Sequence, residues 1–255
     1  ATTNSNPVTP VSEEPATYPV QVQSEETKTV VEDNEKVTVT PVSYSWGSSS
    51  SYVFRIEVKV TNNGSDTASG VKVSVPLLEN SSPYQSTSLK SVNYPVLSKS
   101  GRVSTFDLGD MSPGETKIIK ADFDIKARPV SINSTNETIE LARTAFDKHA
   151  GSGNCRDLAR AFIKSARDVG LQAREVIGFA RVDRGAIRSG SLQGSRHSWA
   201  EFYVDGLGWV PVDLTFQYFG KFPTTSHIVE SYSDQSVQIS YTGGSLSASW
   251  SNAIL

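Results

Sequence analysis

Cys155 is the single cysteine of the 255-residue chain, and its neighbours suit a reactive thiol better than a packed one. Asn154 is a good N-cap residue, and Asp157 follows in the first turn of a predicted helix. The positive end of the helix dipole favours the thiolate at that position. A lone cysteine can also pack as a small hydrophobic side chain, but the flanking Gly153 and Arg156 are small or polar. The sequence therefore predicts that Cys155 is a nucleophile.

A thiolate nucleophile needs a base, and the chain has three histidines that can supply one. His149 lies near the end of a predicted helix, where a cation is favourable, so we expect a helix-terminal role for it. His227 has no nearby acidic residue on a strand of known face, and we expect it to be structural. His197 opens the alternating segment HSWAEFYV, a predicted strand with one core-facing side. The sequence therefore predicts His197 as the base.

Asp213 is the residue that we expect to orient His197. It ends the next predicted strand, WVPVD, which follows after a glycine-containing turn. A carboxylate bonded to one ring nitrogen of a histidine fixes the tautomer and stabilises the imidazolium. The alternative is a turn residue placed before Thr215. The choice depends on the register of the two strands.

The loop between these strands decides on which face Asp213 lies. A two-residue turn would place Asp213 opposite Ala200, on the face away from His197. A three-residue loop at 205–207, which contains glycine, makes Val204 pair with Gly208. This register places Asp213 opposite Trp199. Asp213 then lies one diagonal step from His197 on the same face, within reach of its side chain.

Two predicted helices and a set of strands must position these residues. Residues 136–150 show apolar side chains on one helical face, and so do residues 155–169. Gly170 stands where a left-handed C-terminal cap is expected. The pattern then predicts a strand at 171–182, a polar loop at 183–196, and strands at 197–204 and 209–213.

The preceding part of the chain, residues 36–130, has the period-two alternation of β-strands. In the segment 53–60, Phe54 and every second residue after it are apolar, which predicts a core-facing side. Turn signals such as Asn62-Asn63-Gly64 separate several such segments, which is typical of a β-sandwich. Residues 1–35 are rich in Pro, Ser, Thr and Glu and predict a disordered linker or stalk.

The second half of the chain resembles the transglutaminase-like superfamily. The segments that carry this resemblance are GNCRDLARAFIKSARDVGLQAREVIGF and HSWAEFYVDGLGWVPVD, followed by LT, and they span residues 153–215. Cys155, His197 and Asp213 match the family's Cys-His-Asp triad in the family's order. Leu214 stands where the family usually has proline. The other matching positions are Gly153, Asp157, Ala159, Arg167, Gly170, Leu171, Ala173, Arg174, Gly178, Phe179, Trp199, Glu201, Gly208, Trp209 and Thr215.

The resemblance implies an α+β fold with a papain-like core at 131–255, in which the helix carrying the cysteine packs on an antiparallel sheet. A separate Ig-like β-sandwich domain is expected to precede it at 36–130, because the segment LGDMSPGETKIIKADFDI resembles the last strands of such modules on exported microbial proteins. The implied reaction is acyl transfer through a cysteine thioester on a protein or peptide amide. A primary amine as acceptor gives cross-linking, whereas water gives deamidation or proteolysis.

The composition excludes several other classes of function. The formal net charge of -3 and the pI near 5.7 give no electrostatic basis for binding nucleic acid. No apolar run approaches the roughly 18 residues that a transmembrane helix needs. No calcium-loop or zinc pattern is present, so no cofactor or metal is expected. One cysteine excludes an internal disulfide. The stalk-like start and the sequons at Asn63, Asn80, Asn133 and Asn136 favour an exported or cell-surface protein.

Some interpretations stay open at this level. A non-catalytic surface protein that uses the same fold for binding or scaffolding is the alternative to the enzyme. Glu201 is expected either to support the triad or to be an exposed strand carboxylate. Trp199 is a candidate for the second oxyanion donor, beside the Cys155 backbone N–H. The arginines at 181, 184, 188 and 196 either select an acidic substrate or form a solvated loop.

Overall fold

The computed structural model describes residues 29–32, 35–38, 41–79, 82–149, 151 and 153–255. Its contacts divide the chain into two compact units, Ala1–Pro41 and Val42–Leu255. In the first unit, β1 (Thr29–Glu32) and β2 (Glu35–Thr38) pair as an antiparallel hairpin. Residues 1–28 lie outside the described residues, so the predicted stalk stays a prediction.

A five-stranded antiparallel sheet carries the residues predicted to do chemistry. Its strands, in spatial order, are β15 (Tyr218–Phe219), β14 (Gly208–Asp213), β13 (Arg196–Val204), β11 (Ala173–Ala180) and β17 (His227–Ser231). Strand β13 lies at the centre of this sheet, with β14 and β11 as its hydrogen-bonded neighbours. Both faces of β13 are buried along nearly its whole length.

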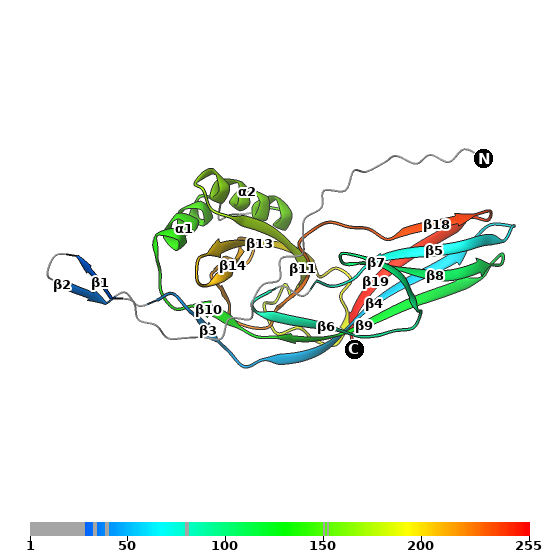
Figure 1. Cartoon of the computed structure of the whole chain (residues 1–255), viewed down its shortest axis with the longest axis horizontal. Helices are drawn as coiled ribbons and strands as arrows, with labels where there is room; N and C mark the ends of the chain where they lie inside the picture. The colour runs from blue at the N-terminus through cyan, green and yellow to red at the C-terminus, as the bar shows by residue number, and fades with distance from the viewer. Residues whose placement is uncertain (1–28, 33–34, 39–40, 80–81, 150, 152) are drawn as a thin grey trace. The chain divides into compact units, whose positions relative to one another are not determined.

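Two helices pack beside this sheet, as the sequence predicts. Helix α1 spans Glu137–His149 and helix α2 spans Cys155–Asp168. Each helix buries the apolar side chains that recur every three or four residues, such as Phe146 and Phe162. Figure 1 shows both helices over strands β13 and β14. Gly170, after the end of α2, has a φ of +85°, which confirms the predicted left-handed cap.

Two further antiparallel sheets, called the larger sheets because one of them contains the longest described strands, enclose a second core. One contains, in spatial order, β12 (Gly190–Ser191), β19 (Leu246–Ile254), β4 (Ser50–Asn62), β9 (Thr116–Ala127) and β6 (Gln85–Val92). The other contains β18 (Gln238–Thr242), β5 (Ala68–Pro76), β8 (Val103–Met111) and β7 (Val96–Ser100). Phe54 and the alternate residues after it on β4 are buried in this core, which confirms the predicted face.

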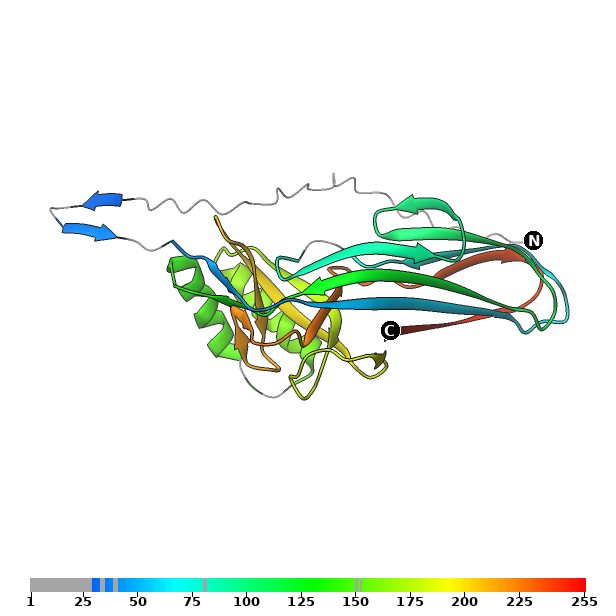
Figure 2. The ribbon, with the colours of Figure 1, turned by 90° about the horizontal axis from the view of Figure 1, so that it is seen from below.

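The last strands of the chain belong to these two larger sheets. Strand β19 pairs with β4 from Leu246 opposite Asn62 to Ile254 opposite Phe54, and β18 pairs with β5. In Figure 2 the strands β4, β9 and β19 run side by side over much of their length. The predicted domain bounds, 36–130 and 131–255, place β18 and β19 in the catalytic domain. Their hydrogen-bonded partners, β5 and β4, lie in the predicted Ig-like domain. Those domain bounds stay a prediction.

A small three-stranded sheet connects the two halves of Val42–Leu255. It consists of β16 (Lys221–Phe222), β10 (Val130–Ile132) and β3 (Tyr44–Trp46). Side chains from early segments, such as Tyr44 and Tyr84, are buried in the core beneath the helices. Conversely, Phe179 and Ile228 are buried in the core of the larger sheets. The two halves therefore share their packing. Neither helix in the described part of the chain has the length and apolar character of a membrane-spanning helix.

Candidate active site

His197 and Asp213 lie together at one edge of β13 and β14. Val204 pairs with Gly208, and Ala200 pairs with Val212, which is the register that the three-residue loop predicts. Nε2 of His197 is 2.7 Å from Oδ2 of Asp213. Because an ionised carboxylate only accepts hydrogen bonds, the Nε2–H group is the donor. The ring is thereby held with its Nδ1 atom free of the proton in the neutral form.

The Asp213 carboxylate is fully buried and receives three donors. Besides His197, the Phe216 backbone N–H donates to Oδ1 at 3.0 Å, and Nε2–H of His227 donates to Oδ2 at 2.9 Å. Burial opposes ionisation, but the hydrogen bonds and charges of the two histidines outweigh it, so the pKa of Asp213 lies well below its usual range. The site therefore holds a fixed negative charge.

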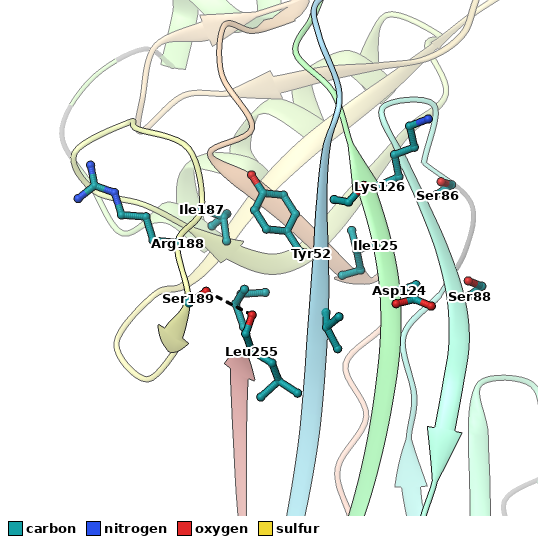
Figure 3. A pocket seen from close by; sticks show the side chains of 13 residues that line it. Tyr52, Ser86, Ser88, Asp124, Ile125, Lys126, Ile187, Arg188, Ser189 and Leu255 are labelled. Carbon is teal, nitrogen blue, oxygen red and sulfur yellow. Dashed lines mark hydrogen bonds between the residues drawn. The ribbon is translucent and has the colours of Figure 1, made fainter.

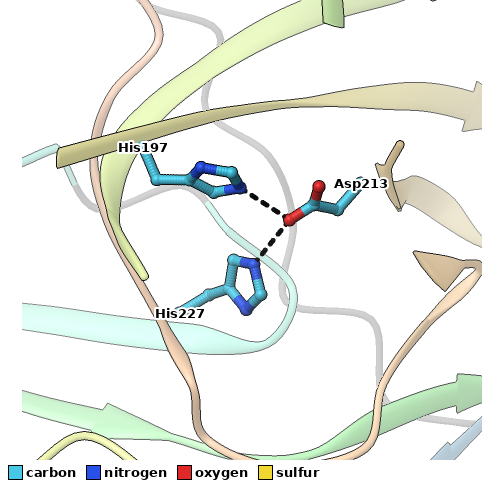
Figure 4. A group of neighbouring side chains, drawn as sticks. All are labelled: His197, Asp213 and His227. Atoms are coloured by element: carbon cyan, nitrogen blue, oxygen red, sulfur yellow. Dashed lines mark hydrogen bonds and ion pairs between the residues drawn. The ribbon is translucent and has the colours of Figure 1, made fainter. Parts of the chain in front are cut away.

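His227 is the residue of this site that sequence reasoning missed. The expectation of a purely structural residue is wrong in one respect, because its ring contacts the same carboxylate oxygen as His197 (Figure 4). Strand β17 pairs with β11, on the opposite side of β11 from β13, and brings His227 beside Ala180. No local sequence signal indicates this pairing, because it joins segments that are separated by the whole hairpin β13–β14.

The environment of His227 is closed and mostly aromatic. Its ring stacks on Phe222 with centroids 4.0 Å apart and an interplanar angle of 9°, and the Trp199 ring lies nearly perpendicular to it with centroids 5.1 Å apart. Nδ1 lies 2.8 Å from the Ser226 hydroxyl. Burial lowers the pKa of His227 below its usual value, although Asp213 acts in the opposite direction. His227 is therefore a neutral ring at neutral pH.

Cys155 is the first residue of α2 and its side chain is partly exposed. The predicted cap is confirmed, since the Asn154 side chain accepts a hydrogen bond of 2.9 Å from the Arg156 backbone N–H. The thiol thus stands in the first turn of a helix, where the helix dipole favours an anion. Within the described residues it is a free cysteine.

Contacts along α2 show the direction in which its N-terminus, which carries Cys155, points relative to the sheet. Near the end of the helix, the Arg167 side chain donates to the Ala173 carbonyl at the start of β11. Near its beginning, Arg156 donates to Glu175, further along β11, at 2.9 Å. Strand β11 continues to Gly178, which pairs with His197. The helix therefore runs against β11, and its N-terminus is directed towards the His197 end of the sheet.

Glu201 and Trp199 belong to a buried hydrogen-bonded network. Glu201 is fully buried, so the expectation of an exposed carboxylate is wrong. It accepts hydrogen bonds from the Tyr84 hydroxyl at 2.6 Å and from Arg174 at 2.7 Å. Trp199 donates its indole N–H to the Tyr84 oxygen at 2.9 Å, so this N–H is already used and is no free oxyanion donor.

The loop after β11 places one arginine beside the histidine pair. The guanidinium of Arg184 lies 5.6 Å from the ring centres of Phe216 and Tyr218, and the Phe216 ring stacks on His197 at 5.0 Å. Arg184 has a φ of +60°, which is unusual for a residue with a side chain. The other arginines of this loop have different partners, since Arg181 pairs with Asp183 and Arg196 pairs with Glu230.

Among the described residues, one group has the composition of a metal-ligand set: His197, Asp213 and His227, whose nearest ligand atoms lie within 4.8 Å of one another. Both Nε2–H groups already point at the carboxylate oxygen, so the hydrogen bonds account for the arrangement. We interpret the group as a hydrogen-bonded chain. That no cofactor is needed stays a prediction.

A surface groove lies next to this site, between strands of the larger sheet and the loop at 187–189. Tyr52, Ile125 and Lys126 line one side, and Ile187 lines the other (Figure 3). None of the predicted triad residues lines it. The Tyr52 hydroxyl lies 2.7 Å from the hydroxyl of Thr225, two residues before His227. The groove thus reaches the segment that carries His227 but not the reacting groups.

Comparisons with known proteins show similarity over parts of the chain. A stretch of 75 residues is 37% identical to an uncharacterized protein of Haemophilus influenzae (strain ATCC 51907 / DSM 11121 / KW20 / Rd), covering 24% of this chain and 20% of the relative. The chain thus spans about a fifth of that relative's length. A crystal structure of a proposed cysteine protease from Cytophaga hutchinsonii superposes with a TM-score of 0.40 and 12% identity, over 83% of this chain and 100% of that one. Residues 118–214, which include Cys155, His197 and Asp213, match the transglutaminase-like superfamily.

Proposed function

We propose that this protein is a thiol-dependent acyltransferase or peptidase in which Cys155 is the nucleophile, His197 the base and Asp213 the residue that orients the base. The observation that carries the proposal is the buried 2.7 Å hydrogen bond between His197 and Asp213. It fixes the imidazole at the end of the sheet towards which the N-terminus of α2 points. The family match over the same residues supports the assignment.

The chemistry follows from the tautomer of His197. Because Nε2 keeps its proton for Asp213, Nδ1 is the atom that takes the proton of the Cys155 thiol. The thiolate then attacks an amide carbonyl carbon, and the C–N bond breaks as His197 gives the proton to the leaving nitrogen. A thioester with Cys155 remains.

The second half of the reaction regenerates the thiolate. An acceptor, either water or a primary amine, loses a proton to Nδ1 of His197 and attacks the thioester carbon. The C–S bond breaks, and the product is a carboxylate or a new amide. Asp213 stays ionised throughout and stabilises the imidazolium, because its pKa is held well below the usual range by its hydrogen bonds despite burial.

A negatively charged oxygen develops on the substrate in both halves of the reaction, and hydrogen-bond donors must stabilise it. The backbone N–H of Cys155, in the first turn of α2, is the donor that we assign. It belongs to the residues whose N–H groups have no partner within the helix. The Trp199 indole is excluded from this role, because its N–H bonds Tyr84.

The substrate class is a protein or peptide amide, either a glutamine side chain or the main chain. The test is mass spectrometry of glutamine-bearing peptides incubated with the protein and a primary amine. Amine incorporation identifies a cross-linker, a mass gain of one unit from amide to acid identifies a deamidase, and chain cleavage identifies a peptidase. The Cys155→Ala variant is the control, and it must abolish whichever product forms. Products that persist in this variant contradict the proposal.

The two larger sheets are proposed to act as an Ig-like spacer or adhesion module of an exported or cell-surface protein. Two antiparallel sheets around one apolar core support this. The sequons at Asn63 and Asn136 already serve the fold, since Asn63 donates to Ser247 and Asn136 accepts from the Ile139 N–H at the start of α1. Fractionation of the source cells, with detection of the chain in the medium, wall or cytosol, tests the location.

A further inference from the structure

Two imidazole rings share one oxygen atom of Asp213. The Nε2 atoms of His197 and His227 lie 2.7 Å and 2.9 Å from Oδ2, while Oδ1 is occupied by the Phe216 N–H. The proposed mechanism uses only the first of these rings. A second buried histidine on the orienting carboxylate therefore calls for its own explanation, because a carboxylate oxygen can be satisfied by simpler donors.

The hydrogen bonds determine the tautomer of His227. The ionised carboxylate can only accept, so Nε2 of His227 carries the hydrogen. In a neutral ring Nδ1 is then an acceptor, and the Ser226 hydroxyl at 2.8 Å must donate to it. The chain of donors runs from Ser226 through His227 to Asp213, and every polar atom in it has a partner.

Packing fixes the orientation of this donor. The His227 side chain is 1% exposed, and it lies face to face with the Phe222 ring at 4.0 Å. Phe216 and Trp199 pack against it in T-shaped arrangements, with ring centroids 5.3 Å and 5.1 Å from that of His227. The ring has little freedom to turn away from Asp213, so the N–H dipole points permanently at the carboxylate.

The two donors compete for the same negative charge. When His197 carries a second proton, its attraction to Asp213 is reduced by the positive end of the His227 N–H dipole on the same oxygen. A low local dielectric strengthens this effect, because Asp213 is fully buried. With His227 replaced by an apolar ring, the whole carboxylate charge would act on His197.

We propose that His227 is a positioning residue that weakens the hold of Asp213 on the proton of His197, so that His197 can both take and release a proton. The inference rests on the proposed role of His197 as base. It predicts a specific electrostatic coupling between two rings that the proposed function does not require.

The test must keep constant the other titratable or charged groups around this pair. They are Asp213 on β14, Tyr218 on β15, Arg184 of the loop after β11 and the Tyr84–Glu201 pair behind Trp199. Cys155, at the start of α2, joins them as the proposed partner of His197. Of these, Cys155 is the group that exchanges a proton with His197 in the proposed mechanism. All measurements are therefore made in the Cys155→Ala background.

The experiment is an NMR pH titration of the His197 ring proton in the full chain, compared between His227→Phe and the background protein. Phenylalanine keeps an aromatic ring on Phe222 but removes the N–H donor. We expect the pH midpoint of His197 to rise by about half a unit or more. The background protein should also show two downfield imidazole N–H signals, and His227→Phe should show one.

Three further variants make the test specific. His227→Gln retains an N–H donor and should return the midpoint of His197 towards that of the background protein. Phe222→Leu removes the stacking partner without touching the hydrogen bond and should leave the midpoint unchanged. Ser226→Ala removes the hydroxyl that donates to Nδ1 of His227 and should shift the midpoint upwards by less than His227→Phe does.

An unchanged or lower midpoint in His227→Phe would overturn the proposal, and so would an equal shift in Phe222→Leu, since packing alone would then be the cause. If His227→Phe does not fold, the Ser226→Ala and His227→Gln titrations decide the question by the same criteria. None of these measurements requires turnover. If the wild-type chain forms no acyl-transfer or cleavage product while the variants show the expected shifts, the proposed function is contradicted and the coupling is established.

Discussion

Tyr84 and Glu201 are separated by 117 positions in the sequence, yet their side chains share a buried hydrogen bond of 2.6 Å. Tyr84 precedes strand β6 of the larger sheet, and Glu201 lies on β13, four residues after His197. The same hydroxyl accepts the Trp199 N–H, and Trp199 stacks against His197 at 6.1 Å. Burial, followed by the charge of Glu201, raises the pKa of Tyr84 well above its usual value, so the hydroxyl stays a donor.

The Tyr84→Phe variant tests how much this connection between Tyr84, Glu201 and Trp199 contributes to stability. The variant leaves the Trp199 N–H and one Glu201 oxygen without their partner in a buried site, so we expect a loss of about 1–3 kcal/mol in the free energy of unfolding. The control is Tyr203→Phe, at a partly exposed position of β13, the strand that carries Glu201. It should change stability by under ~0.5 kcal/mol. Denaturant unfolding measures both. Equal, small effects would show that the network contributes little to stability.

Replacement of Asp213 by asparagine should affect both stability and chemistry. An amide group offers donors where His197, His227 and the Phe216 N–H all donate, so at least one buried donor loses its acceptor. We expect acyl-transfer activity to fall by about 10²–10⁴-fold, because the tautomer and orientation of His197 are lost. Activity against the peptide that the wild-type chain processes, together with a melting curve, checks this. Wild-type activity in the variant would remove Asp213 from the mechanism.

Stability should fall as the pH is lowered below about 6.5, the unperturbed value for histidine, partly because of His227. Burial lowers its pKa in the folded state, so the unfolded chain binds the proton more readily. The stabilisation is therefore complete when the pH is above the pKa of His227 in the unfolded chain. It is lost as the pH falls towards the lower pKa that His227 has in the folded state. The expected slope is at most ~1.4 kcal/mol per pH unit for one group.

The comparison that isolates this effect is denaturant unfolding of His227→Gln at a series of pH values. The variant should show a flatter dependence than the wild-type chain as the pH falls below about 6.5. Below about pH 4 both proteins should lose stability as the pH falls. The pKa of Asp213 is depressed in the folded state, so the unfolded chain binds this proton more readily as well. Parallel curves over the whole range would mean that His227 is not buried as a neutral ring.

Arg184 is expected to set a preference for acidic substrates. Its guanidinium lies near the Phe216 ring that stacks on His197. Its left-handed backbone is held by two hydrogen bonds: its N–H donates to the Arg181 carbonyl, and its carbonyl accepts from the Thr224 hydroxyl. Arg184→Gly should keep this backbone and raise KM for acidic peptides by about 5-fold, which corresponds to roughly 1 kcal/mol.

Neutral peptides should be processed by Arg184→Gly with unchanged KM. Arg188→Ala, in the same loop, provides a matched loss of charge away from the Phe216 ring and should leave both KM values alone. If Arg188→Ala raises KM for acidic peptides as much as Arg184→Gly does, the preference reflects the charge of the loop as a whole.

The local signals around Cys155 and between His197 and Asp213 were sufficient to predict their elements. The N-cap at Asn154, the cap glycine at position 170 and the loop at 205–207 each depend on residues that are close in sequence, and all three are observed. Such features are fixed by backbone geometry and short hydrogen bonds, so a single sequence contains them.

The residues that the sequence did not predict depend on pairings over long distances. His227 reaches Asp213 only because β17 joins the far side of β11, and Tyr84 reaches Glu201 only because early segments enter the core beneath the helices. The sequence leaves open whether Glu201 supports the triad or is an exposed carboxylate, because alternation along a strand does not tell whether its polar face is covered. The pairing of β19 with β4 is equally invisible in the local pattern.

The central claim is that the thiol of Cys155 reacts as a partner of His197. The most direct measurement is the rate of Cys155 alkylation by iodoacetamide at neutral pH, in the wild-type chain, in His197→Ala and in His149→Ala. His149 is the control, since its ring bonds Ser165 on the other end of α2. We predict fast, stoichiometric labelling in the wild type and in His149→Ala, and labelling at least ~10-fold slower in His197→Ala. Equal, slow labelling of all three proteins would contradict the account and favour a non-catalytic scaffold.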